Sequence, residues 1–532
     1  MSEITKTKDQ NPKTKNQFVW LLFAFVIIFI YFFALSIPLL GPDEPRYSQI
    51  AREMFERGDW ITPKLGGYDW FEKPALLYWL QIFFYKIFGV NEFAARFGSA
   101  LFGLGTILSL WILGKSLATK NTEKTGEFEN QKPKTKDQKP KNEFANYLAL
   151  IAASSIGLIA FSRGASFDII LTFPITAALV AFFIFDQSSK KSGFTFYFLL
   201  STFYFFIGIS LIAKGLVGIV FPFAIVGFYY VLSWRFPSKT FIFSLFWGTL
   251  FAFIVASAWY FPMYQANGWK FIDEFFIQHH FQRYTSNKYQ HPQPFWFFFA
   301  VLPLMTIPWL PFFFAGIWNF AKELFYQKDA KTQKRKFPFL PFSSSPLLLF
   351  SLSWLAVPLV FFSISGSKLP GYILPALPGA LILTAIYVYQ FVQKSVRREW
   401  LIKGIALATF AVVAVILQFF IMDYASHETT KNLIDTANAK GFEREKIVNL
   451  YTVSHNLEFY ALNRLVRETD GKLKRFDDFS VLVNAAKNEP NRQILVLVPQ
   501  KDIASLMKQT DIADLELLSD NGESALLLVK LK

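Results

Sequence analysis

The chain has 532 residues, of which 53% are hydrophobic and 19% aromatic, and it contains no cysteine. So much apolar surface excludes an ordinary soluble protein, and the lack of cysteine excludes disulfides and thiolate metal sites. The net charge of +15 does not indicate nucleic-acid binding, because the lysines and arginines lie mostly in loops between apolar segments. This distribution is the positive-inside pattern of membrane proteins.

Residues 1–17 form a polar tail with lysines, which we expect to be cytoplasmic. Residues 18–40 predict an uncleaved membrane anchor, because the segment is too long for a signal peptide and has no cleavage site. Further apolar segments extend the predicted mainly α-helical, polytopic membrane domain over residues 18–422, with about 11 to 13 transmembrane helices. These segments are 93–118, 145–162, 169–185, 194–213, 216–234, 241–263, 295–320, 346–364, 371–392 and 401–422.

The first loop, residues 41–92, is crowded with charged and aromatic residues. Pro45 suits a first helical position, with Asp43 and Glu44 before it as capping groups. The apolar spacing that follows predicts a short amphipathic helix that ends at Gly58 and lies on the membrane surface. Residues 75–90 are apolar but short, and predict a second interfacial helix.

The span count puts the strongly basic loops on one side of the membrane and the loops with Asp43, Asp168, His280 and Lys368 on the other. With a cytoplasmic N-terminus, these four loops are external, that is, periplasmic or extracellular, in a protein of the plasma (inner) membrane. The lysine-rich, low-complexity residues 119–143 are expected to be a disordered cytoplasmic insert.

Two other regions lie outside the predicted membrane. Residues 264–294 form a second external loop, which holds His279 and His280. Residues 423–532 differ sharply in composition, and the runs KIVNLYTV, QILVLVP and SALLLVKL predict strands. We therefore expect a small external α/β domain at the C-terminus, in which no motif identifies a chemistry.

Asp43 and Glu44 are the first candidates for catalysis. A carboxylate at the membrane rim could deprotonate an acceptor hydroxyl, while nearby cations neutralise a phosphate leaving group. The alternative is that both residues only cap the helix and pair with Arg46, and spacing alone favours this alternative.

Asp168 lies between two apolar segments next to Arg163, where an ionisable group is costly and indicates function. Its alternative is an ion pair with Arg163. Lys214 and Lys368 could each bind a phosphate, although Lys214 could equally extend its ammonium to the membrane interface. Two adjacent histidines point different ways on a helix, so a metal site would need a further ligand such as Glu72.

The first external loop resembles that of the bacterial lipid A aminoarabinose transferases, which are relatives of the dolichyl-phosphate-mannose–protein mannosyltransferases. The residues that carry the resemblance are DEPRYSQIAREM, GDW and FEKP, followed by YW. Further matches are FDIILTF around Asp168, AKG at 213–215, HHFQRY at 279–284 and SKLPGYILPALP at 367–378. The resemblance spans residues 18–395 and implies the GT-C membrane glycosyltransferase fold.

The resemblance also implies roles for individual residues. Asp43 matches the leading catalytic acid of the family, and Asp168 matches a second acidic position. Glu72 and His280 match a proposed divalent-metal pair, which makes a metal ion a candidate cofactor, although His279 replaces an acidic residue that is usual there. The positions expected to serve the donor phosphate and lipid are Arg46, Lys73, Lys214, Lys368 and Tyr372.

These observations predict a membrane glycosyltransferase. It would move a sugar from a polyprenyl-phosphate-linked donor to a hydroxyl of a lipid A-like lipid, another cell-envelope glycan or a protein, at the external face of the membrane. With Asp43 as the only base and no covalent intermediate, the sugar would be inverted. One alternative is a flippase or transporter of lipid-linked sugars, which should show paired repeats and broken helices near the membrane centre. The other is a structural or assembly membrane protein, in which the loop charges serve only as anchors and Asp43→Asn is tolerated. Apart from membrane lipids, the expected partners are therefore the lipid-linked donor and the acceptor.

Overall fold

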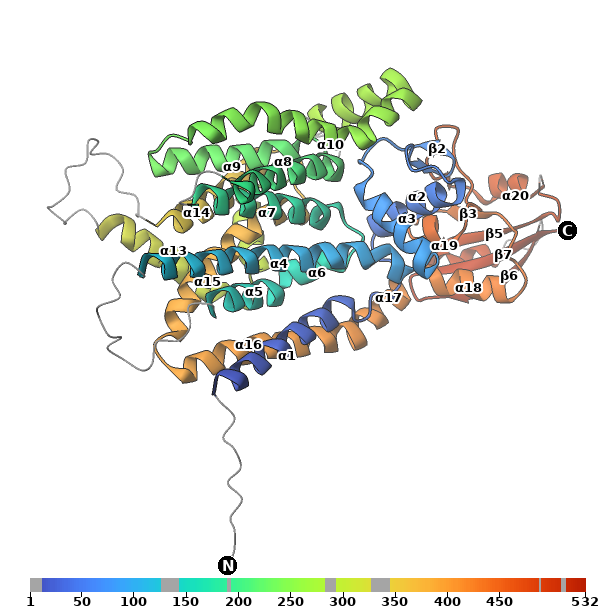
Figure 1. Ribbon diagram of the computed structural model, residues 1–532. Coiled ribbons are helices and arrows are strands. Elements are labelled where there is room, and N and C mark those ends of the chain that lie inside the picture. The colour runs from blue at the N-terminus through green and yellow to red at the C-terminus, as the bar shows by residue number, and fades with distance from the viewer. Residues whose placement is uncertain are drawn as a thin grey trace, which may run out of the picture.

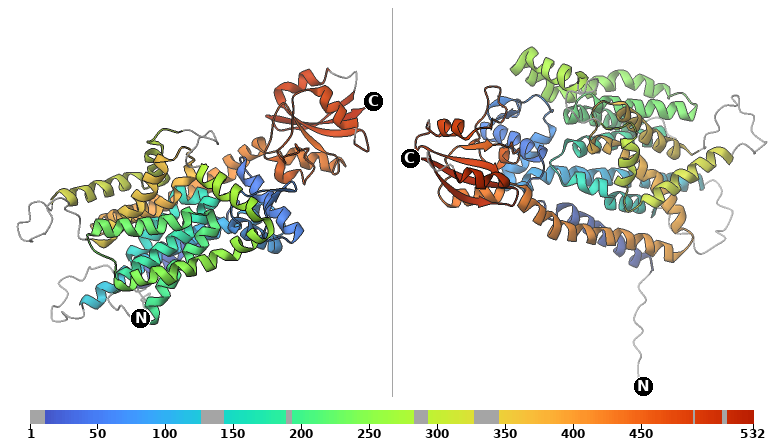
Figure 2. Two further views of the ribbon diagram at one scale, coloured as in Figure 1. Left: turned by 90° about the horizontal axis from the view of Figure 1, so that it is seen from above. Right: turned by 180° about the vertical axis from the view of Figure 1, so that it is seen from behind.

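A computed structural model describes residues 12–125, 143–188, 193–282, 293–326, 345–487, 489–508 and 513–532. The chain forms a long helical bundle with a small α/β domain at one end of it (Figures 1 and 2). The same views place the first external loop, with α2 (Asp43–Arg57) and α3 (Leu76–Phe88), between the bundle and this domain. The predicted fold class, a polytopic helical protein with a C-terminal α/β domain, is confirmed.

Seven helices of the described residues are long and apolar enough to cross a membrane, or nine if each of two bent helix pairs is one span. The bent pairs are α5 (Glu143–Ser154) with α6 (Ile156–Ser162), at 62°, and α12 (Phe297–Met305) with α13 (Leu310–Tyr326), at 114°. The seven are α4 (Glu92–Thr125), α7 (Phe167–Asp186), α8 (Phe194–Lys214), α10 (Lys239–Ile272) with η2 (Asp273–Gln282), α14 (Pro346–Ile364), η4 (Pro370–Ala376) with α15 (Leu377–Val392), and α16 (Val396–Val415) with η5 (Ile416–Ile421) and α17 (Met422–Glu428).

Each span that the sequence predicts overlaps with one of these helices or bent pairs, or with one of the shorter apolar helices α1 (Pro12–Phe32) and α9 (Val217–Ser233). The predicted anchor 18–40 differs most, because α1 begins at Pro12 and ends at Phe32. The shorter α3 matches the expected second interfacial helix in position. The described residues therefore form a multi-pass membrane protein.

Helix α7 is the centre of the bundle. Its sequence is apolar all round, which is typical of a helix buried on all sides. In its most apolar stretch, 83% of the residues are buried. It packs between α4 and α8 and against η4. Because Asp168 lies in the first turn of α7, a helix that is buried on most sides positions this carboxylate.

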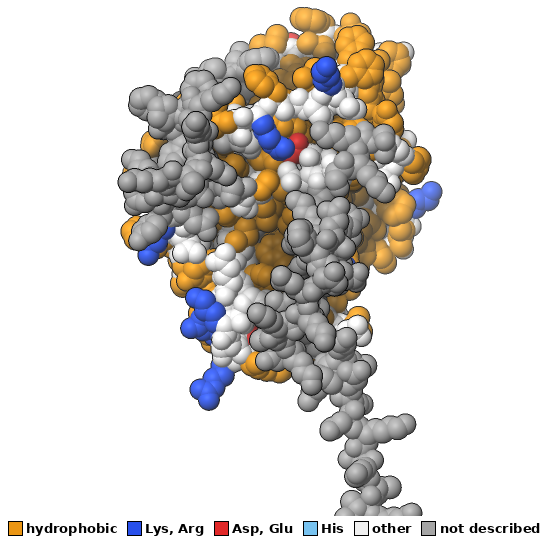
Figure 3. Space-filling view, turned by 60° about the vertical axis from the view of Figure 1, so that its left-hand side comes forward, with side chains coloured by type: hydrophobic (Ala, Val, Ile, Leu, Met, Phe, Trp, Pro, Cys, Tyr) orange, Lys and Arg blue, Asp and Glu red, His pale blue; other side chains and the backbone are white. Residues whose placement is uncertain are grey.

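The outer helices face the surroundings instead. In the most apolar stretch of the span that α10 forms, only 28% of the residues are buried, and in the span that begins with α16 only 17% are buried. Such exposure is expected for helices in contact with lipid. Figure 3 looks toward the end of the bundle that lies away from the α/β domain. Lysine and arginine side chains are scattered over this end, whereas hydrophobic side chains cover much of the surface around it.

Helix α2 corrects two expectations. It begins at Asp43 rather than Pro45, and its N-cap residue, Pro42, provides no side-chain hydrogen bond, so the predicted capping role of Asp43 and Glu44 is wrong. The predicted end is confirmed, because Gly58 has the left-handed conformation with φ of 65°. The polar side of α2 is buried rather than exposed, because the α/β domain covers it.

Four other predicted segments also differ or lie outside the described residues. Helix α10 continues beyond Met263, so the expected loop 264–294 is helical as far as Gln282, apart from an interruption at Gly268. Helix α4 likewise continues to Thr125, into the expected insert 119–143, of which residues 126–142 lie outside the described part. The predicted basic loops at 190–191 and 328–336 also lie outside it.

The C-terminal domain has a five-stranded sheet in the order β4-β3-β5-β7-β6. Strands β4, β3 and β5 are parallel, and β7 and β6 are antiparallel to their neighbours. The three predicted runs form β3, β5 and β7. Helix α20 packs on one face of the sheet, and α18 and α19 pack on the other. The elements are α18 (Lys431–Ala439), β3 (Ile447–Leu450), α19 (Leu457–Tyr460), β4 (Arg475–Phe476), α20 (Phe479–Lys487), β5 (Gln493–Pro499), η6 (Gln500–Asp502), α21 (Ile503–Leu506), β6 (Ala513–Asp520) and β7 (Ser524–Leu531).

Candidate functional site

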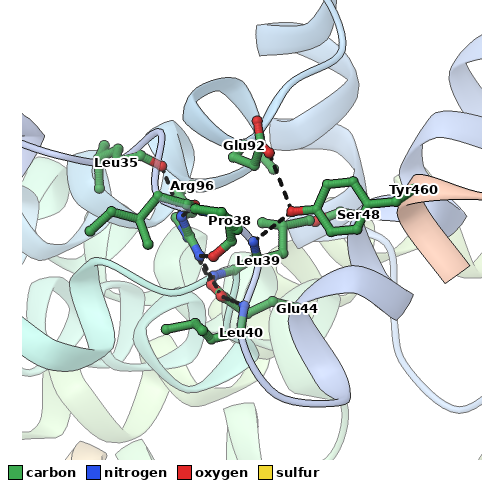
Figure 4. A network of polar contacts seen from close by, with 12 residues as sticks. Leu35, Pro38, Leu39, Leu40, Glu44, Ser48, Glu92, Arg96 and Tyr460 are labelled. Carbon is green, nitrogen blue, oxygen red and sulfur yellow. Dashed lines mark hydrogen bonds and ion pairs between the residues drawn. The ribbon is translucent and has the colours of Figure 1, made fainter. Parts of the chain in front are cut away.

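A buried ion pair fixes the start of the first external loop. Arg96 of α4 donates to both carboxylate oxygens of Glu44, from Nε at 3.0 Å and from Nη2 at 2.6 Å. The same guanidinium donates to the backbone carbonyls of Leu35, Ile37 and Pro38. Figure 4 shows the arginine between these carbonyls and Glu44. The bidentate geometry is the strong form of this interaction, so one side chain of the bundle holds the segment that leads into α2.

Glu44 is fully engaged by these contacts. Its carboxylate also accepts the backbone N–H groups of Leu40, at 2.9 Å, and of Ala165, at 2.7 Å. Burial acts to raise the pKa of Glu44, but the charge of Arg96 and the hydrogen bonds hold that pKa below its ordinary value. A carboxylate with so many donors is a weak proton acceptor, so these contacts favour a positioning role for Glu44 over a role as base.

Asp43 differs from Glu44 in its exposure. Its side chain is 55% exposed, and its ion-pair partner is Arg46, whose Nη1 lies 3.3 Å from Oδ1. The pairing with Arg46 that spacing suggests is therefore present, but it involves only one oxygen of the carboxylate. Asp43 is the carboxylate of the pair that an external molecule can reach.

Asp168 belongs to a second cluster, formed by α7, α8 and η4. The expected alternative, an ion pair with Arg163, is wrong, because Arg163 donates to the carbonyls of Ile30 and Phe33. Asp168 instead pairs with Lys214, at the end of α8. The ammonium of Lys214 lies 4.9 Å from the centre of the Tyr372 ring.

Gly371 explains how η4 comes so close to this cluster. A Cβ atom at this position would collide with the carboxylate of Asp168 and with the ring of Phe161. Glycine therefore allows the backbone of η4 to pack directly against the Asp168–Lys214 pair, with Tyr372 beside it.

Aromatic rings join the segments that carry the two carboxylates. The ring centre of Phe167, next to Asp168 in the chain, lies 4.9 Å from that of Tyr47 and 5.5 Å from that of Tyr78. Burial, then the charges of Glu72 and Asp43, raises the pKa of Tyr47, so these carboxylates lie near the same rings. The hydroxyl of Tyr78 is buried without a hydrogen-bond partner among the described residues. The sequence analysis did not select these tyrosines.

Glu72, Lys73 and Lys368 lie in connecting segments. Glu72 and Lys73 pair with each other at 3.0 Å, between the hairpin β1 (Lys64–Leu65) and β2 (Tyr68–Asp69) and helix α3. Lys368 is buried before η4, and its ammonium donates to the carbonyl of Ser365 at 2.6 Å. The structure thus brings Lys214 and Tyr372 to Asp168 and Arg46 to Asp43, whereas Lys368 faces its own turn.

The expected metal pair is described only in part. His280 lies in η2, but its side chain is outside the described residues, and Glu72 is paired with Lys73. Among the described residues, no three histidines, aspartates or glutamates group to hold a metal ion. These residues therefore do not by themselves fit a metal ion, and the Glu72–His280 pair stays a prediction.

The C-terminal domain completes the environment of the loop. The hydroxyl of Tyr460 accepts the N–H of Leu39 at 2.8 Å and donates to Glu92 of α4 at 3.2 Å (Figure 4). Lys431 pairs with Glu92 at 2.6 Å. These contacts join residues hundreds of positions apart, and no local sequence pattern could have indicated them.

The sequences of known proteins support the predicted family. A family model described as dolichyl-phosphate-mannose-protein mannosyltransferase matches residues 72–123. The undecaprenyl phosphate-alpha-4-amino-4-deoxy-L-arabinose arabinosyl transferase of Serratia proteamaculans is 27% identical over 401 residues, which are 74% of this chain and 64% of that protein. Its counterpart in Yersinia enterocolitica is 28% identical over 388 residues, 72% of this chain and 61% of that protein. The matches thus span less than two thirds of these relatives.

Solved structures agree with the sequences. ArnT from Cupriavidus metallidurans has a TM-score of 0.71 in the apo state and 0.66 when bound to undecaprenyl phosphate, in both cases at 19% identity. The superpositions cover 97% and 96% of this chain, and 98% and 97% of ArnT. The chain therefore has the GT-C fold of membrane glycosyltransferases. The two relatives named above are aminoarabinose transferases, which confirms the resemblance seen in the first external loop.

Replacement of Glu44 by glutamine tests the anchor of the loop. Glu44→Gln keeps the shape of the side chain but leaves the buried Arg96 without a counter-charge, which costs about 3 kcal/mol. We expect a clearly lower Tm for the full chain in detergent. The control is Glu56→Gln, which changes an exposed carboxylate on the same helix and should keep the wild-type Tm. An unchanged Tm for Glu44→Gln would show that the ion pair does not hold the loop.

Proposed function

We propose that the chain is a glycosyltransferase that moves a sugar from a polyprenyl-phosphate donor to a hydroxyl acceptor. The observation that carries the proposal is a GT-C fold with two carboxylates on segments that pack together through buried aromatic rings: Asp43, exposed beside Arg46, and Asp168, beside Lys214. The names of the relatives support the donor class, because they refer to a sugar on undecaprenyl phosphate. The ArnT structure with undecaprenyl phosphate supports it as well.

The proposed location is the plasma (inner) membrane, with a cytoplasmic N-terminus and the site and C-terminal domain on the external side. Positive charges on the bundle end opposite the domain support this orientation (Figure 3). In the proposed domain plan, residues 1–17 are the cytoplasmic tail, 18–422 the membrane domain and 423–532 the external domain. A lipid-linked donor then reaches the site from within the membrane.

The cations of the site are proposed to bind the donor phosphate. Lys214 pairs with Asp168 and Arg46 pairs with Asp43, and each cation still has N–H groups to donate. The ring of Tyr372 lies over the ammonium of Lys214. Lys73 and Lys368 would add charge from the adjoining segments. Neutralisation by these groups makes polyprenyl phosphate a good leaving group, so the reaction does not require a general acid.

Asp43 is proposed as the general base. Its carboxylate takes the proton of the acceptor hydroxyl, whose oxygen attacks the anomeric carbon from the face opposite the phosphate. The bond from this carbon to the phosphate oxygen breaks, and the polyprenyl phosphate leaves with the electron pair, so the configuration inverts. Asp168 orients Lys214 toward the phosphate, and Glu44 positions the loop.

The alternative of a flippase or transporter has less support. Transporters bind their substrates near the membrane centre, between repeated halves. In this chain the described groups of the candidate site lie on loops and at helix ends, at the end of the bundle beside the C-terminal domain. This position suits chemistry at the membrane surface.

The test of the base is the substitution Asp43→Asn. We expect the release of polyprenyl phosphate, with transfer of labelled sugar from membrane lipid extracts, to fall at least about 100-fold, because general base catalysis contributes this much. The control Glu56→Gln, on the same helix, should keep wild-type turnover. Turnover of Asp43→Asn within about threefold of the wild type would remove Asp43 as the base. No transfer by the wild type, from extracts shown to contain such donors, would overturn the proposed function.

A second substitution tests the Asp168 cluster without changing a charge. Gly371→Ala forces a methyl group into the space of the Asp168 carboxylate and so separates it from Lys214. We expect turnover to fall about tenfold or more, since small misplacements at a reaction centre have large effects. The control is Gly227→Ala, whose Cβ meets nothing within 4 Å. Equal turnover for both variants would contradict the proposed role of this cluster.

A further inference from the structure

The C-terminal domain contributes a side chain that contacts Arg46 of the candidate site. Nη2 of Arg46 lies 3.2 Å from Nδ1 of His455. A guanidinium can only donate, so Nδ1 accepts and the ring proton is on Nε2. Burial, together with the charge of Arg46, lowers the pKa of His455 to about 4. At neutral pH the imidazole is therefore uncharged, as an acceptor must be.

Three groups from different segments surround the Arg46 guanidinium. Nη1 lies 3.3 Å from Asp43 on the same helix, and Nη2 contacts His455 from the C-terminal domain. The ring centre of Trp70, after β2, lies 5.5 Å from the guanidinium carbon. The side chain of Arg46 is only 17% exposed. The guanidinium is thus fixed in one orientation, with N–H groups left over for a ligand.

The position of His455 in its own domain supports a functional role. It lies in the segment 451–456, which leaves the carboxyl end of the parallel strand β3. The chain passes from β3 to β4 on one side, while β5 lies on the other. In open α/β sheets, functional residues lie outside such carboxyl ends, where the strand order reverses. The N–H of Ser454 donates to the Asn449 side chain at 3.3 Å, which ties this segment to β3.

We propose that His455 is a positioning residue, which holds Arg46 ready for the phosphate of the lipid-linked donor. Without His455, the guanidinium is free to turn and pair with both oxygens of Asp43, which is its strongest available contact. This pairing would take N–H groups away from the phosphate. The inference rests on the proposed function for the identity of the ligand, but it concerns a domain to which that function assigns no role.

The test compares variants of the full chain in detergent. His455→Leu removes the acceptor, and we expect the KM for the donor to rise about tenfold, as for the loss of a hydrogen bond to a charged group. Because the bound phosphate itself then orients Arg46, kcat should fall less than about threefold. His455→Asn places an amide oxygen near the position of Nδ1 and should restore the wild-type KM. A KM that stays raised in His455→Asn, or that is unchanged in His455→Leu, would overturn the inference.

A matched control separates positioning from simple docking of the domain. Gln49 of α2 donates to the side chain of Asn463 at 2.9 Å across the same interface, without contact to Arg46. Asn463 has φ of 64°, so Asn463→Gly removes this hydrogen bond and keeps the backbone conformation. We expect a wild-type KM for this control. An equal rise in KM for Asn463→Gly and His455→Leu would overturn the positioning role.

A binding measurement keeps this inference distinct from the proposed function. The probe is a polyprenyl phosphate without sugar, titrated onto the wild type and the same variants. We expect the Kd of His455→Leu to rise about tenfold, with recovery in His455→Asn. Binding with this pattern but without sugar transfer by the wild type would support the role of His455 and overturn the proposed function. Transfer by the wild type with equal Kd values for all variants would overturn the role of His455 and support the proposed function.

Discussion

The interaction on which the rest of the site depends is the buried pair of Arg96 and Glu44. A single guanidinium of the bundle takes the carboxylate of Glu44 and three backbone carbonyls of the preceding segment. This arrangement sets where α2 begins, and therefore where Asp43 and Arg46 lie. The same carboxylate also reaches Ala165, three residues before Asp168. One ion pair thus sets the position of both carboxylates that we propose for the reaction.

The two neighbouring acids in the loop show how environment separates similar groups. Glu44 is buried among donors, and its pKa lies below its ordinary value, so it binds and does not exchange protons. Asp43 is largely exposed, and Arg46 contacts only one of its two oxygens. Since the two residues are adjacent on a helix, their side chains point in different directions. One acid fixes the loop, and the other is left for chemistry.

Much of the fold could be predicted from the sequence, because it depends on local patterns. The apolar segments, the end of α2 at Gly58 and the strands β3, β5 and β7 each follow from residues close together in the chain. The sequence predicts too early an end for α10. The polar residues after Met263 mark the end of the apolar span, whereas the helix itself continues. The buried polar side of α2 could not be predicted either, because only the folded C-terminal domain covers it. The identity of Asp43, Asp168 and Lys214 as candidates came from the sequence, but the pairing of Asp168 with Lys214 came from the structure.

The contact between α2 and the C-terminal domain has a consequence for the synthesis of the protein. Arg52 of α2 donates to the carbonyl of Phe459 at 2.7 Å, across 407 positions of the chain. Since the ribosome makes the chain from its N-terminus, α2 emerges long before the residues that bury its polar side. Until residues 455–463 have been made, Arg46 has no His455 and Arg52 has no Phe459 carbonyl to bind. An early segment of the chain is thus among the last to acquire its final surroundings, and an incomplete chain cannot present a finished site.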